Sequence, residues 1–567
     1  MVKISKKIKM IKKIKKFLID NNLDGFIIPK NDHYFTEYSN VDNLYRVTNF
    51  SGSAGFALIL KNKNYLFVDG RYTLQAKKQS GKNFVILEIP HFLPKNLLPY
   101  IDSKIGFDPK LFTEEIIEKY FENKFNLIPI EFNFNNKPEK TINYIYNLND
   151  KICGESPKKK IAKVKNYLIN NKIDYLYISA GENVNWLMNI RGKDLPNSPL
   201  ANCKMIISTK GKSIFFTKLN KTLFLNKRNF KNTLFYEENK FFQIISSLKR
   251  GSFCIDKNTC SIFEHEILKS KFKILSKIDP IYELKSLKNS IEIKNTIKAH
   301  IEDGVALTKF LYWYKLNKKN VTEKDIEKKL EKFRKKSKNY LFSSFDTIAG
   351  SGPNGAIIHY KSNYQTNRII KKNDILLIDS GGQYKWGTTD VTRTICKGII
   401  SDKIKKNFTR VLKGHIAVVT CDLKKNFNGK LIDKLARKEL NKVKLDYSHG
   451  TGHGVGFFLN VHEGPQSISK YNEVSIKEGM ILSNEPGYYL NNQYGIRIEN
   501  LIYVKKLQNK LIFKNLTYAP IDIDLINFKM LTVKERNYLF DYHLETYSKI
   551  SEYLNMNEKK WLRGLIK

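Results

Sequence analysis

DILLIDSGGQYKWGTTDVTRT, residues 374–394, carries two carboxylates around which the C-terminal half of this chain is organised. Its apolar run 375–378 ends at Asp379, and a charged residue in such a run needs a partner. Gly381, Gly382 and the polar residues that follow predict a turn between two strands. We therefore expect a hairpin across which Asp379 and Asp390 face each other.

Three later segments add an imidazole and two more carboxylates. Glu485 precedes Pro486, which holds its backbone extended. In the run 495–499, period-two alternation places Arg497 and Glu499 on one face of a strand and two isoleucines on the other. The three segments are HGTGHGVGFFLNVHEGP at 449–465, which contains His453, LSNEPGYY at 482–489 and YGIRIENL at 494–501.

Four carboxylates and one imidazole form a ligand set for divalent metal ions. An oxygen-rich set with a single imidazole suits two hard or borderline ions such as Mn2+, ahead of Zn2+ or Co2+. Two such ions, about 3.5–4 Å apart, can share carboxylates and a hydroxide that attacks an amide carbonyl. The sequence therefore favours a hydrolase with a dinuclear metal centre, whose predicted ligands are Asp379, Asp390, His453, Glu485 and Glu499.

The spacing of His449 and His453, four residues apart, also matches a zinc-binding helix. Glycines at 450, 452, 454 and 456 oppose a helix here. An extended, glycine-permissive strand or loop, which lets substrate approach closely, fits these residues better. We expect His449 to form a wall of the substrate pocket. Arg497, which cannot bind a metal, is expected to orient a ligand carboxylate.

Taken together, these segments resemble the pita-bread metallopeptidases, and within them the aminopeptidase P family. The resemblance covers nearly the whole chain, because it continues through SFDTIAGSGPNGAIIHY at 344–360, FSGSAGFALIL at 50–60, DGRYTLQA at 69–76 and WLMNIRGKDLP at 186–196. It implies an α/β architecture of two related creatinase-like domains followed by a pita-bread catalytic domain. All five metal ligands of the family are present, which argues against its metal-free relatives, creatinase and the histone-chaperone domains.

The resemblance also implies an activity, the release of an N-terminal residue that precedes proline. His359 would bind substrate or shuttle a proton, and His462 would bind substrate and steady the carbonyl as it becomes an oxyanion. A pKa near neutrality suits histidine for both tasks. Glu485 would act as general base. Prolidase, which cleaves only dipeptides, shares the ligands, but two N-terminal domains and HEGPQ at 462–466 favour the aminopeptidase. Methionine aminopeptidase usually lacks those domains.

Composition places the chain among large globular proteins. With 567 residues, of which 41% are hydrophobic, it is too long for a single core. No segment has the length and apolarity of a transmembrane helix. Six scattered cysteines without a CxxC pair predict reduced thiols and a cytoplasmic location. The basic start, MVKISKKIKMIKKIKKFLIDNN, predicts an amphipathic helix and not a secretory signal; without arginine it gives little support to a transit peptide.

The formal charge of +44 is the main argument for a different class of function, nucleic-acid binding. Its lysines are spread along the chain beside abundant asparagine, and no nucleic-acid-binding motif is present. This distribution favours a compositional origin of the charge. As partners we expect peptides with an N-terminal Xaa-Pro sequence and a second copy of the chain in a homodimer, but neither a membrane nor a specific nucleic acid.

An internal repeat at an offset of 150 residues predicts a duplicated N-terminal half. FLIDNNLD at 17–24 corresponds to YLINNKID at 167–174, and each copy leads from a helical pattern into a strand. We predict a first creatinase-like domain at 1–155, a second at 156–285, the catalytic domain at 286–515 and a helical C-terminal extension at 516–567. We expect Trp561 of this extension to be buried against the catalytic domain or a second subunit.

Overall fold

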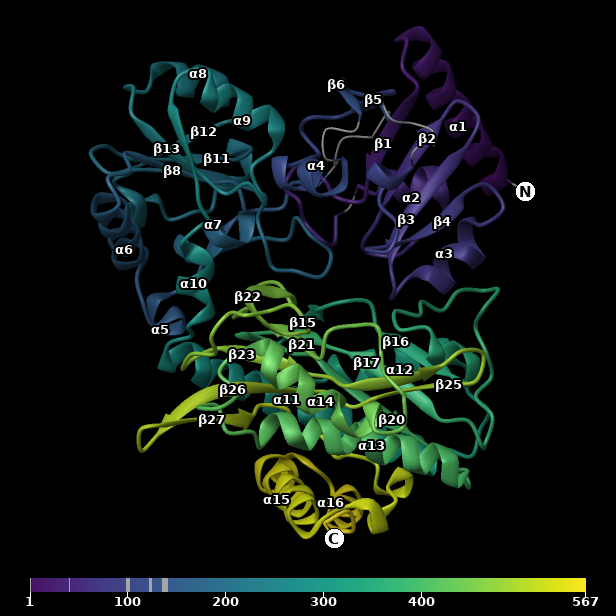
Figure 1. Ribbon diagram of the computed structural model, residues 1–567. Coiled ribbons are helices and arrows are strands. Elements are labelled where there is room, and N and C mark those ends of the chain that lie inside the picture. Colours follow the sequence, from purple (N-terminus) through teal and green to yellow (C-terminus); the bar gives the residue numbers. More distant parts are fainter. Residues whose placement is uncertain (1, 40, 98–101, 122–124, 135–140, 567) are drawn as a thin grey trace. The chain divides into compact units, whose positions relative to one another are not determined.

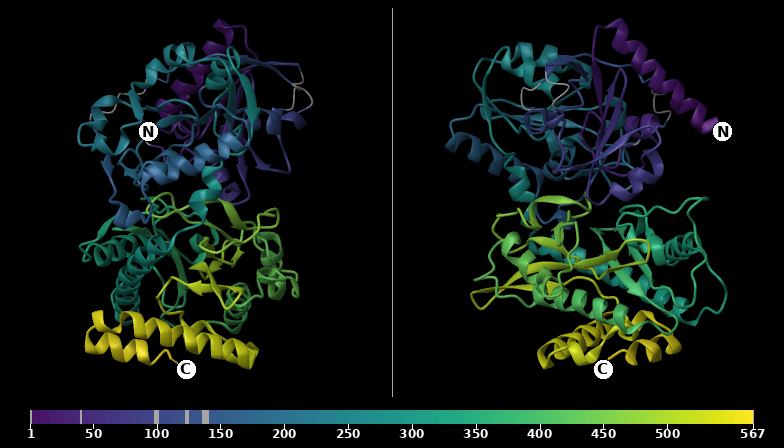
Figure 2. Two further views of the ribbon diagram at one scale, coloured as in Figure 1. Left: turned by 90° about the vertical axis from the view of Figure 1, so that its left-hand side faces the viewer. Right: turned by 45° about the vertical axis from the view of Figure 1, so that its right-hand side comes forward.

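The computed structural model describes residues 2–39, 41–97, 102–121, 125–134 and 141–566, with the backbone alone for residues 2–8. The chain divides into two compact units, Met1–Tyr282 and Glu283–Lys567, each of which mixes helices with strands (Figures 1 and 2). No helix within the described ranges is both long and apolar enough to cross a membrane.

The first unit contains two six-stranded sheets with the same topology. Their strand orders are β4-β3-β2-β1-β5-β6 and β12-β11-β10-β8-β13-β14. In each sheet, two antiparallel pairings in the middle are flanked by parallel pairings on both sides. The duplicated α/β fold expected from the repeat is therefore confirmed.

The strands of the two sheets follow one another in the same order in both halves, although the helices between them are placed differently. The first sheet and its helices comprise α1 (Val2–Asp20), β1 (Gly25–Pro29), α2 (Asn43–Thr48), β2 (Phe56–Leu60), β3 (Asn64–Asp69), α3 (Thr73–Ser80), β4 (Val85–Ile89), β5 (Lys104–Phe107), α4 (Glu114–Phe121) and β6 (Asn126–Pro129). The second comprises α6 (Pro157–Asn170), β8 (Tyr175–Ile178), α7 (Gly181–Leu187), β10 (Lys204–Ser208), β11 (Ser213–Phe216), β12 (Thr233–Tyr236), α8 (Phe241–Ser247), β13 (Ser252–Ile255), α9 (Ile262–Lys269) and β14 (Lys273–Ser276).

The repeated octapeptide makes the same connection in both copies. Each copy ends a helix and turns into the central strand of a sheet. Its final residue, Asp24 or Asp174, accepts a hydrogen bond from the backbone of the neighbouring parallel strand. The donors are the N–H groups of Lys104 and Ser252, each 2.9 Å from the carboxylate. The aspartate that both copies share thus fixes the helix–strand corner to the next strand of the sheet.

The described residues of the second unit form four antiparallel sheets that are covered by α-helices. Its sheets are β15-β18-β19, β16-β17-β20, β22-β21-β23-β26-β27 and β24-β25. The strands are β15 (Tyr340–Ser343), β16 (Ile348–Ser351), β17 (Leu376–Ser380), β18 (Gly382–Tyr384), β19 (Gly387–Thr388), β20 (Val391–Ile395), β21 (Gly452–Gly454), β22 (Glu463–Ile468), β23 (Ile481–Asn484), β24 (Gly487–Leu490), β25 (Tyr494–Arg497), β26 (Asn500–Leu507) and β27 (Lys510–Asn515).

Helices cover these sheets and supply most of the core. They are α11 (Ser290–Leu316), α12 (Glu323–Arg334), α13 (Asp402–Val419), α14 (Gly429–Asn441), α15 (Val533–Ile550) and α16 (Met556–Arg563). Apolar side chains of α11 and α12 pack with β16, β17 and β20, and those of α13 and α14 pack with β22, β23, β26 and β27. The strands that carry the predicted ligands are thereby held between two packed cores.

The C-terminal extension belongs to the same compact unit. Its helices α15 and α16 lie against the rest of the unit in Figure 2. Ile550 and Leu562 are buried in a cluster with partly buried isoleucines of α11. The ring of Trp561 packs on Tyr312 of α11, with centroids 5.7 Å apart. Trp561 is thus half-buried against a helix of its own unit, and its packing on a second subunit stays a prediction.

The hairpin expected from residues 374–394 exists, with a difference in its register and its connection. β17 pairs antiparallel with β20, but Asp379 lies opposite Thr392 rather than Asp390. The connection is not a plain turn, because it forms β18 and β19, which join β15 in a separate sheet. Its residues Gln383, Thr388 and Thr389 are buried, and the Thr388 hydroxyl donates to Gln383 at 2.8 Å. Such internal pairing is what allows a polar stretch to enter the interior.

Candidate metal centre

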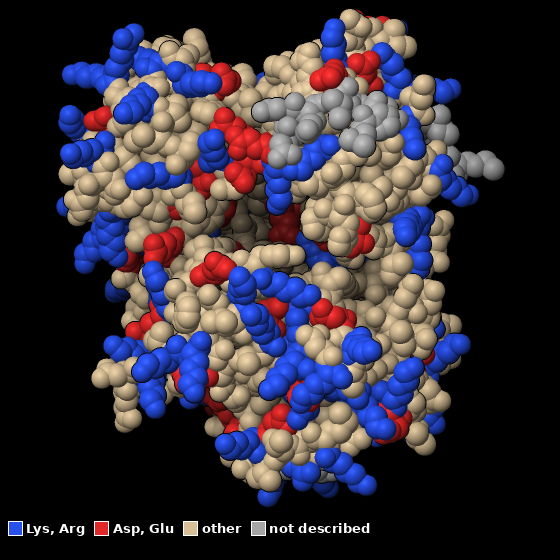
Figure 3. Space-filling model, in the orientation of Figure 1, with Lys and Arg blue, Asp and Glu red and all other residues tan. Residues whose placement is uncertain are grey.

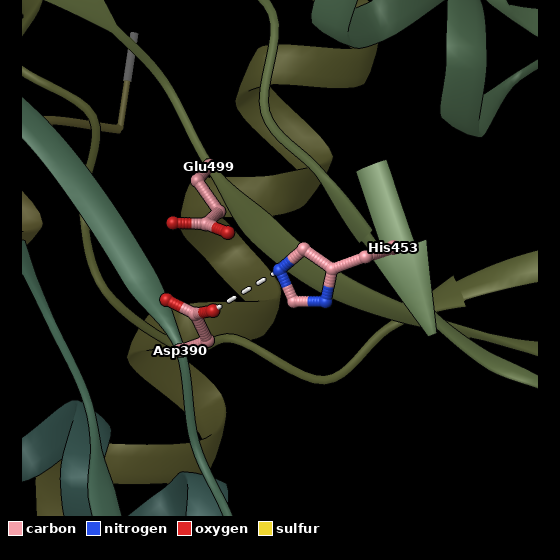
Figure 4. A group of neighbouring side chains, drawn as sticks. All are labelled: Asp390, His453 and Glu499. Atoms are coloured by element: carbon pink, nitrogen blue, oxygen red, sulfur yellow. Dashed lines mark ion pairs between the residues drawn. The ribbon is translucent and has the colours of Figure 1, made fainter. Parts of the chain in front are cut away.

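Five side chains converge where the strands of the second unit end. Asp379 lies on β17 and Asp390 immediately before β20; Glu485 connects β23 to β24, and Glu499 connects β25 to β26. His453 occupies the middle of β21. Ligand atoms of Asp390, His453 and Glu499 all lie within 4.8 Å of one another. In Figure 4 both carboxylates point toward the imidazole.

The remaining two predicted ligands adjoin this group of three. The Nε2 atom of His453 lies 3.4 Å from Asp390 Oδ2 and 3.6 Å from Glu485 Oε1. A chain of hydrogen bonds connects Asp379 to Glu499. Arg497 donates to Asp379 at 2.6 Å and to the Thr392 hydroxyl at 3.1 Å. That hydroxyl donates in turn to Glu499 Oε2 at 2.8 Å. The structure thus brings all five residues into one site.

The backbone around His453 fixes which ring nitrogen faces the carboxylates. Its Nδ1 atom lies 2.9 Å from the carbonyl oxygen of Gly454, so Nδ1 carries the proton and donates it there. Nε2 then presents its lone pair toward Asp390 and Glu485, as a metal ligand requires. The backbone N–H of His453 donates to the Ser483 hydroxyl, which itself donates to Glu485 at 3.1 Å. One serine therefore positions both side chains.

The extended, glycine-rich strand predicted around His453 is confirmed. β21 pairs with β22 and β23, and no helix forms between residues 449 and 456. A Cβ atom added at Gly452 would lie 2.0 Å from the carbonyl oxygen of Ser483. Glycine is needed there because the two backbones approach too closely for any side chain.

Negative charge is concentrated in the site, because four carboxylates lie close together and the neighbouring cationic side chain, Arg497, cannot balance them all. Burial, together with repulsion from Asp379 and Glu485, raises the pKa of Asp390 well above its usual value. Burial and repulsion from Asp390 and Glu485 do the same to the pKa of Glu499. Within the described part of the chain, the buried oxygens Asp379 Oδ1 and Asp390 Oδ1 have no hydrogen-bond partner. Divalent cations fit this arrangement, because they would satisfy those oxygens and neutralise the carboxylates.

A chain of hydrogen bonds runs from the cluster to His449. Arg497, which bonds Asp379, also donates to the Tyr489 hydroxyl at 2.6 Å. That hydroxyl lies 2.9 Å from Nε2 of His449, whose Nδ1 faces the Gly450 carbonyl oxygen at 2.7 Å. Burial raises the pKa of Tyr489 to about 12, so its proton stays available for His449. We did not single out Tyr489 in the sequence; the signal available was its place in LSNEPGYY, four residues after Glu485.

His462 and His359, the other two histidines predicted to act in the site, lie next to different residues of the metal centre. His462 packs edge-on against His453, with ring centroids 4.4 Å apart. His359 is half-buried in a turn that follows the short helix η6 (Gly352–Ala356). The carbonyl oxygen of its neighbour Ile358 lies 3.4 and 3.5 Å from the two terminal nitrogens of Arg497. His359 therefore belongs to a segment that touches the same arginine as Asp379.

A second cluster with metal-binding residue types does not have the same character. Cys396, Asp522 and Asp524 lie close together. Lys315 already pairs with both aspartates, at 2.7 and 2.9 Å. Its ammonium group bonds both carboxylates, Asp524 is exposed, and among the described residues no buried oxygen of this cluster is left without a hydrogen-bond partner.

Family models match successive segments of the chain between residues 10 and 566. The model of "Metallopeptidase family M24" matches residues 294–506, and that of the "C-terminal region of peptidase_M24" matches residues 509–566. Models of the "Creatinase/Prolidase N-terminal domain" match residues 10–131 and 136–292. A probable Xaa-Pro aminopeptidase P from Laccaria bicolor is 35% identical over 97% of this chain and 92% of its own length.

Two solved structures show the same similarity at the level of the fold. X-prolyl aminopeptidase from Caenorhabditis elegans, described as a cytosolic enzyme with a di-nuclear active site, superposes with a TM-score of 0.88. It is 28% identical, over 96% of this chain and 95% of its own. A prolidase from Pyrococcus horikoshii, 25% identical with a TM-score of 0.53, covers 64% of this chain and 99% of its own. The similarity to the prolidase thus leaves about a third of the chain unmatched.

Proposed function

The chain belongs to the Xaa-Pro aminopeptidases of metallopeptidase family M24, and on that premise we propose how its residues carry out the reaction. The protein is a metal-dependent hydrolase that releases the N-terminal residue from peptides with proline in the second position. The observation that carries this function is a buried cluster of carboxylates around one imidazole, in a chain similar to such enzymes over nearly its full length.

Two divalent metal ions belong to this centre, and we propose that Asp379, Asp390, His453, Glu485 and Glu499 hold them. When bound, the ions supply Lewis acidity and a nucleophilic hydroxide near neutral pH. We propose Mn2+ as the metal, because four carboxylates with a single imidazole form an oxygen-rich set. Arg497 acts beside the ligands, since its 2.6 Å hydrogen bond orients Asp379.

Glu485 is the carboxylate placed best for general base catalysis. Its side chain is 18% exposed, compared with 12% for Asp379 and 6% for Asp390. A base has to reach both the attacking water and the leaving nitrogen, which lie on the substrate side of the cluster. Glu485 takes the proton of the attacking water and delivers it to the nitrogen of the proline residue.

Three histidines serve the substrate. His462, beside His453, donates a hydrogen bond to the carbonyl oxygen as negative charge develops on it. His359 binds the peptide or transfers a proton. His449 forms a wall of the proline pocket, where its 2.9 Å contact with Tyr489 holds the ring in place. The free α-amine of the substrate pairs with a carboxylate of the cluster, which restricts cleavage to the first residue.

Further properties of the protein follow as parts of the same proposal. We propose four regions, 1–155, 156–285, 286–515 and 516–567, a homodimeric state and a cytoplasmic location. Peptides are the partners, and no specific nucleic acid is among them. Figure 3 supports the last point, since lysine and arginine side chains are scattered over the visible face with acidic side chains among them.

Peptide length and sequence decide between this function and its alternatives. Manganese-loaded protein is incubated with Ala-Pro-Pro, Ala-Pro and Met-Ala-Ala, and released amino acids are quantified. We expect cleavage of Ala-Pro-Pro at the first bond. Cleavage of the dipeptide alone would indicate a prolidase, and cleavage of Met-Ala-Ala alone would indicate a methionine aminopeptidase.

A further inference from the structure

Glu323, at the first position of α12, is a buried carboxylate outside the metal cluster. Its exposed fraction is 0%. Among the described residues, no ion pair joins it to a lysine, arginine or histidine. A buried carboxylate without a cation is costly unless several donors satisfy its oxygens. Glu323 therefore has a structural cost for which its surroundings must compensate.

Donors from one segment, residues 351–368, provide this compensation. Oε1 accepts from the backbone N–H of Ser351 at 2.8 Å, and Oε2 accepts from the backbone N–H of Arg368 at 3.1 Å. The side-chain amide of Asn354 lies 2.9 Å from Oε2, and so does the Tyr360 hydroxyl. The Glu323 side chain thus forms hydrogen bonds with both ends and the middle of an eighteen-residue segment, most of which has no regular secondary structure.

The backbone of α12 strengthens the same connection. The N–H of Glu323 donates to the carbonyl oxygen of Arg368 at 3.0 Å, so the two residues bond each other reciprocally. The first turn of a helix also favours a negative charge through its free N–H groups. Glu323 is therefore held at a fixed place relative to residue 368.

His359 lies in this segment, between two anchored neighbours. Tyr360, which follows it, bonds Glu323. The carbonyl oxygen of Ile358, which precedes it, faces Arg497 of the metal centre. The position of the His359 imidazole relative to Asp379 thus depends on both anchors, one of which is Glu323.

We propose that Glu323 is a positioning residue, which sets the place of His359 in the active site by organising residues 351–368. This inference rests on the proposed function, because it assigns Glu323 to the step that His359 serves. Among the described residues, Glu323 bonds none of the proposed metal ligands, so its effect on the reaction passes through His359.

A matched pair of variants on α12 tests the proposal. Glu323→Gln turns one oxygen into an N–H donor that faces other donors. Glu327→Gln, one turn later, changes a side chain that accepts from the Ser362 hydroxyl at 2.6 Å in the same loop. We expect Glu323→Gln to lower kcat/KM for Ala-Pro-Pro about tenfold or more, and Glu327→Gln by about twofold at most. Metal content should match wild type in both variants.

The double variant Glu323→Gln/His359→Ala separates positioning from general destabilisation. If Glu323 acts through His359, the double variant is as active as His359→Ala to within about twofold. Multiplication of the two single losses would overturn the proposal. Tyr360→Phe, which removes one donor and leaves the carboxylate, should show a smaller loss that also disappears in the His359→Ala background; it carries the same test if Glu323→Gln does not fold.

Hydrogen exchange gives a readout that does not depend on activity. The N–H groups of Ser351 and Arg368 donate directly to Glu323, so peptides that contain them should exchange faster in Glu323→Gln and unchanged in Glu327→Gln. Unchanged exchange in Glu323→Gln would refute the organising role. Inactivity of the wild-type protein on every Xaa-Pro peptide would refute the proposed function instead, and the exchange result would still decide the role of Glu323 in the segment.

Discussion

Replacing Tyr489 with phenylalanine should weaken catalysis while leaving the metal centre loaded. The hydroxyl accepts a hydrogen bond from Arg497 at 2.6 Å and donates one to His449 at 2.9 Å. A hydrogen bond from a charged donor contributes about 1.5–3 kcal/mol and a neutral one about 0.5–1.5 kcal/mol. Tyr489→Phe therefore removes about 2–4 kcal/mol of contacts, some of which entering water restores.

This loss translates into a rate effect that can be measured. If about half of it is expressed in the transition state, kcat/KM for Ala-Pro-Pro falls roughly 5- to 30-fold. Metal content should stay at the wild-type value, because Tyr489 bonds Arg497 and not the ligand oxygens directly. Tyr488→Phe is the matched control, since the ring of Tyr488 packs on Tyr494 within a hydrophobic cluster.

A double-variant cycle locates the effect in the chain of hydrogen bonds. His449→Ala should cost less activity in the Tyr489→Phe background than in the wild type, because the two side chains share a contact. The reasoning is refuted if Tyr489→Phe keeps kcat/KM within twofold of wild type. It is also refuted if Tyr489→Phe loses metal in proportion to activity. That result would mean that Tyr489 serves only to retain the metal ions.

Three further perturbations test separate parts of the account. Glu499→Gln should abolish turnover and lower metal content, whereas His462→Ala should lower turnover with metal content unchanged; elemental analysis beside kinetics distinguishes them. Burial lowers the pKa of His543 to about 4, and its neutral ring accepts from the Ile521 N–H and faces the Leu565 carbonyl. The native state then binds fewer protons than the unfolded state between pH 4 and 6.5, so the free energy of unfolding should fall by up to about 3 kcal/mol as pH drops through this window. Denaturant unfolding of His543→Gln should show a smaller fall, and an equal fall would contradict the assignment. Binding to several unrelated DNA and RNA sequences at about 0.2 M salt should be weak and unselective; tight, sequence-dependent binding would give the charge of +44 a function.

The features predicted from the sequence are those that local patterns determine. The apolar run before Asp379 and the glycines around His453 predicted strands, and strands are found there. The octapeptide repeat predicted the duplicated sheets, because a helix–strand corner is a local structure. The convergence of five distant ligands came from the resemblance to a family, since no spacing in one sequence shows which strand ends meet.

The features that the sequence did not reveal depend on contacts between distant segments. Asp379 and Arg497, which form the 2.6 Å pair, are 118 residues apart. Tyr489 gains its role only from such partners on either side. Glu323 looks like an ordinary acidic residue in the first turn of a helix, where exposure is the usual state. Its burial depends on a segment that follows β16 and folds back over α12. No hydrophobic periodicity in the sequence predicts that this segment packs there.

Metal titration of the purified protein determines whether activity depends on a centre of two metal ions. Metal-stripped protein is titrated with Mn2+, and bound metal per chain is measured beside the hydrolysis of Ala-Pro-Pro. We expect that stripped protein is inactive, that activity returns as the metal binds, and that binding saturates at two ions per chain. Full activity without metal, or saturation without any cleavage of Ala-Pro-Pro, would contradict this expectation.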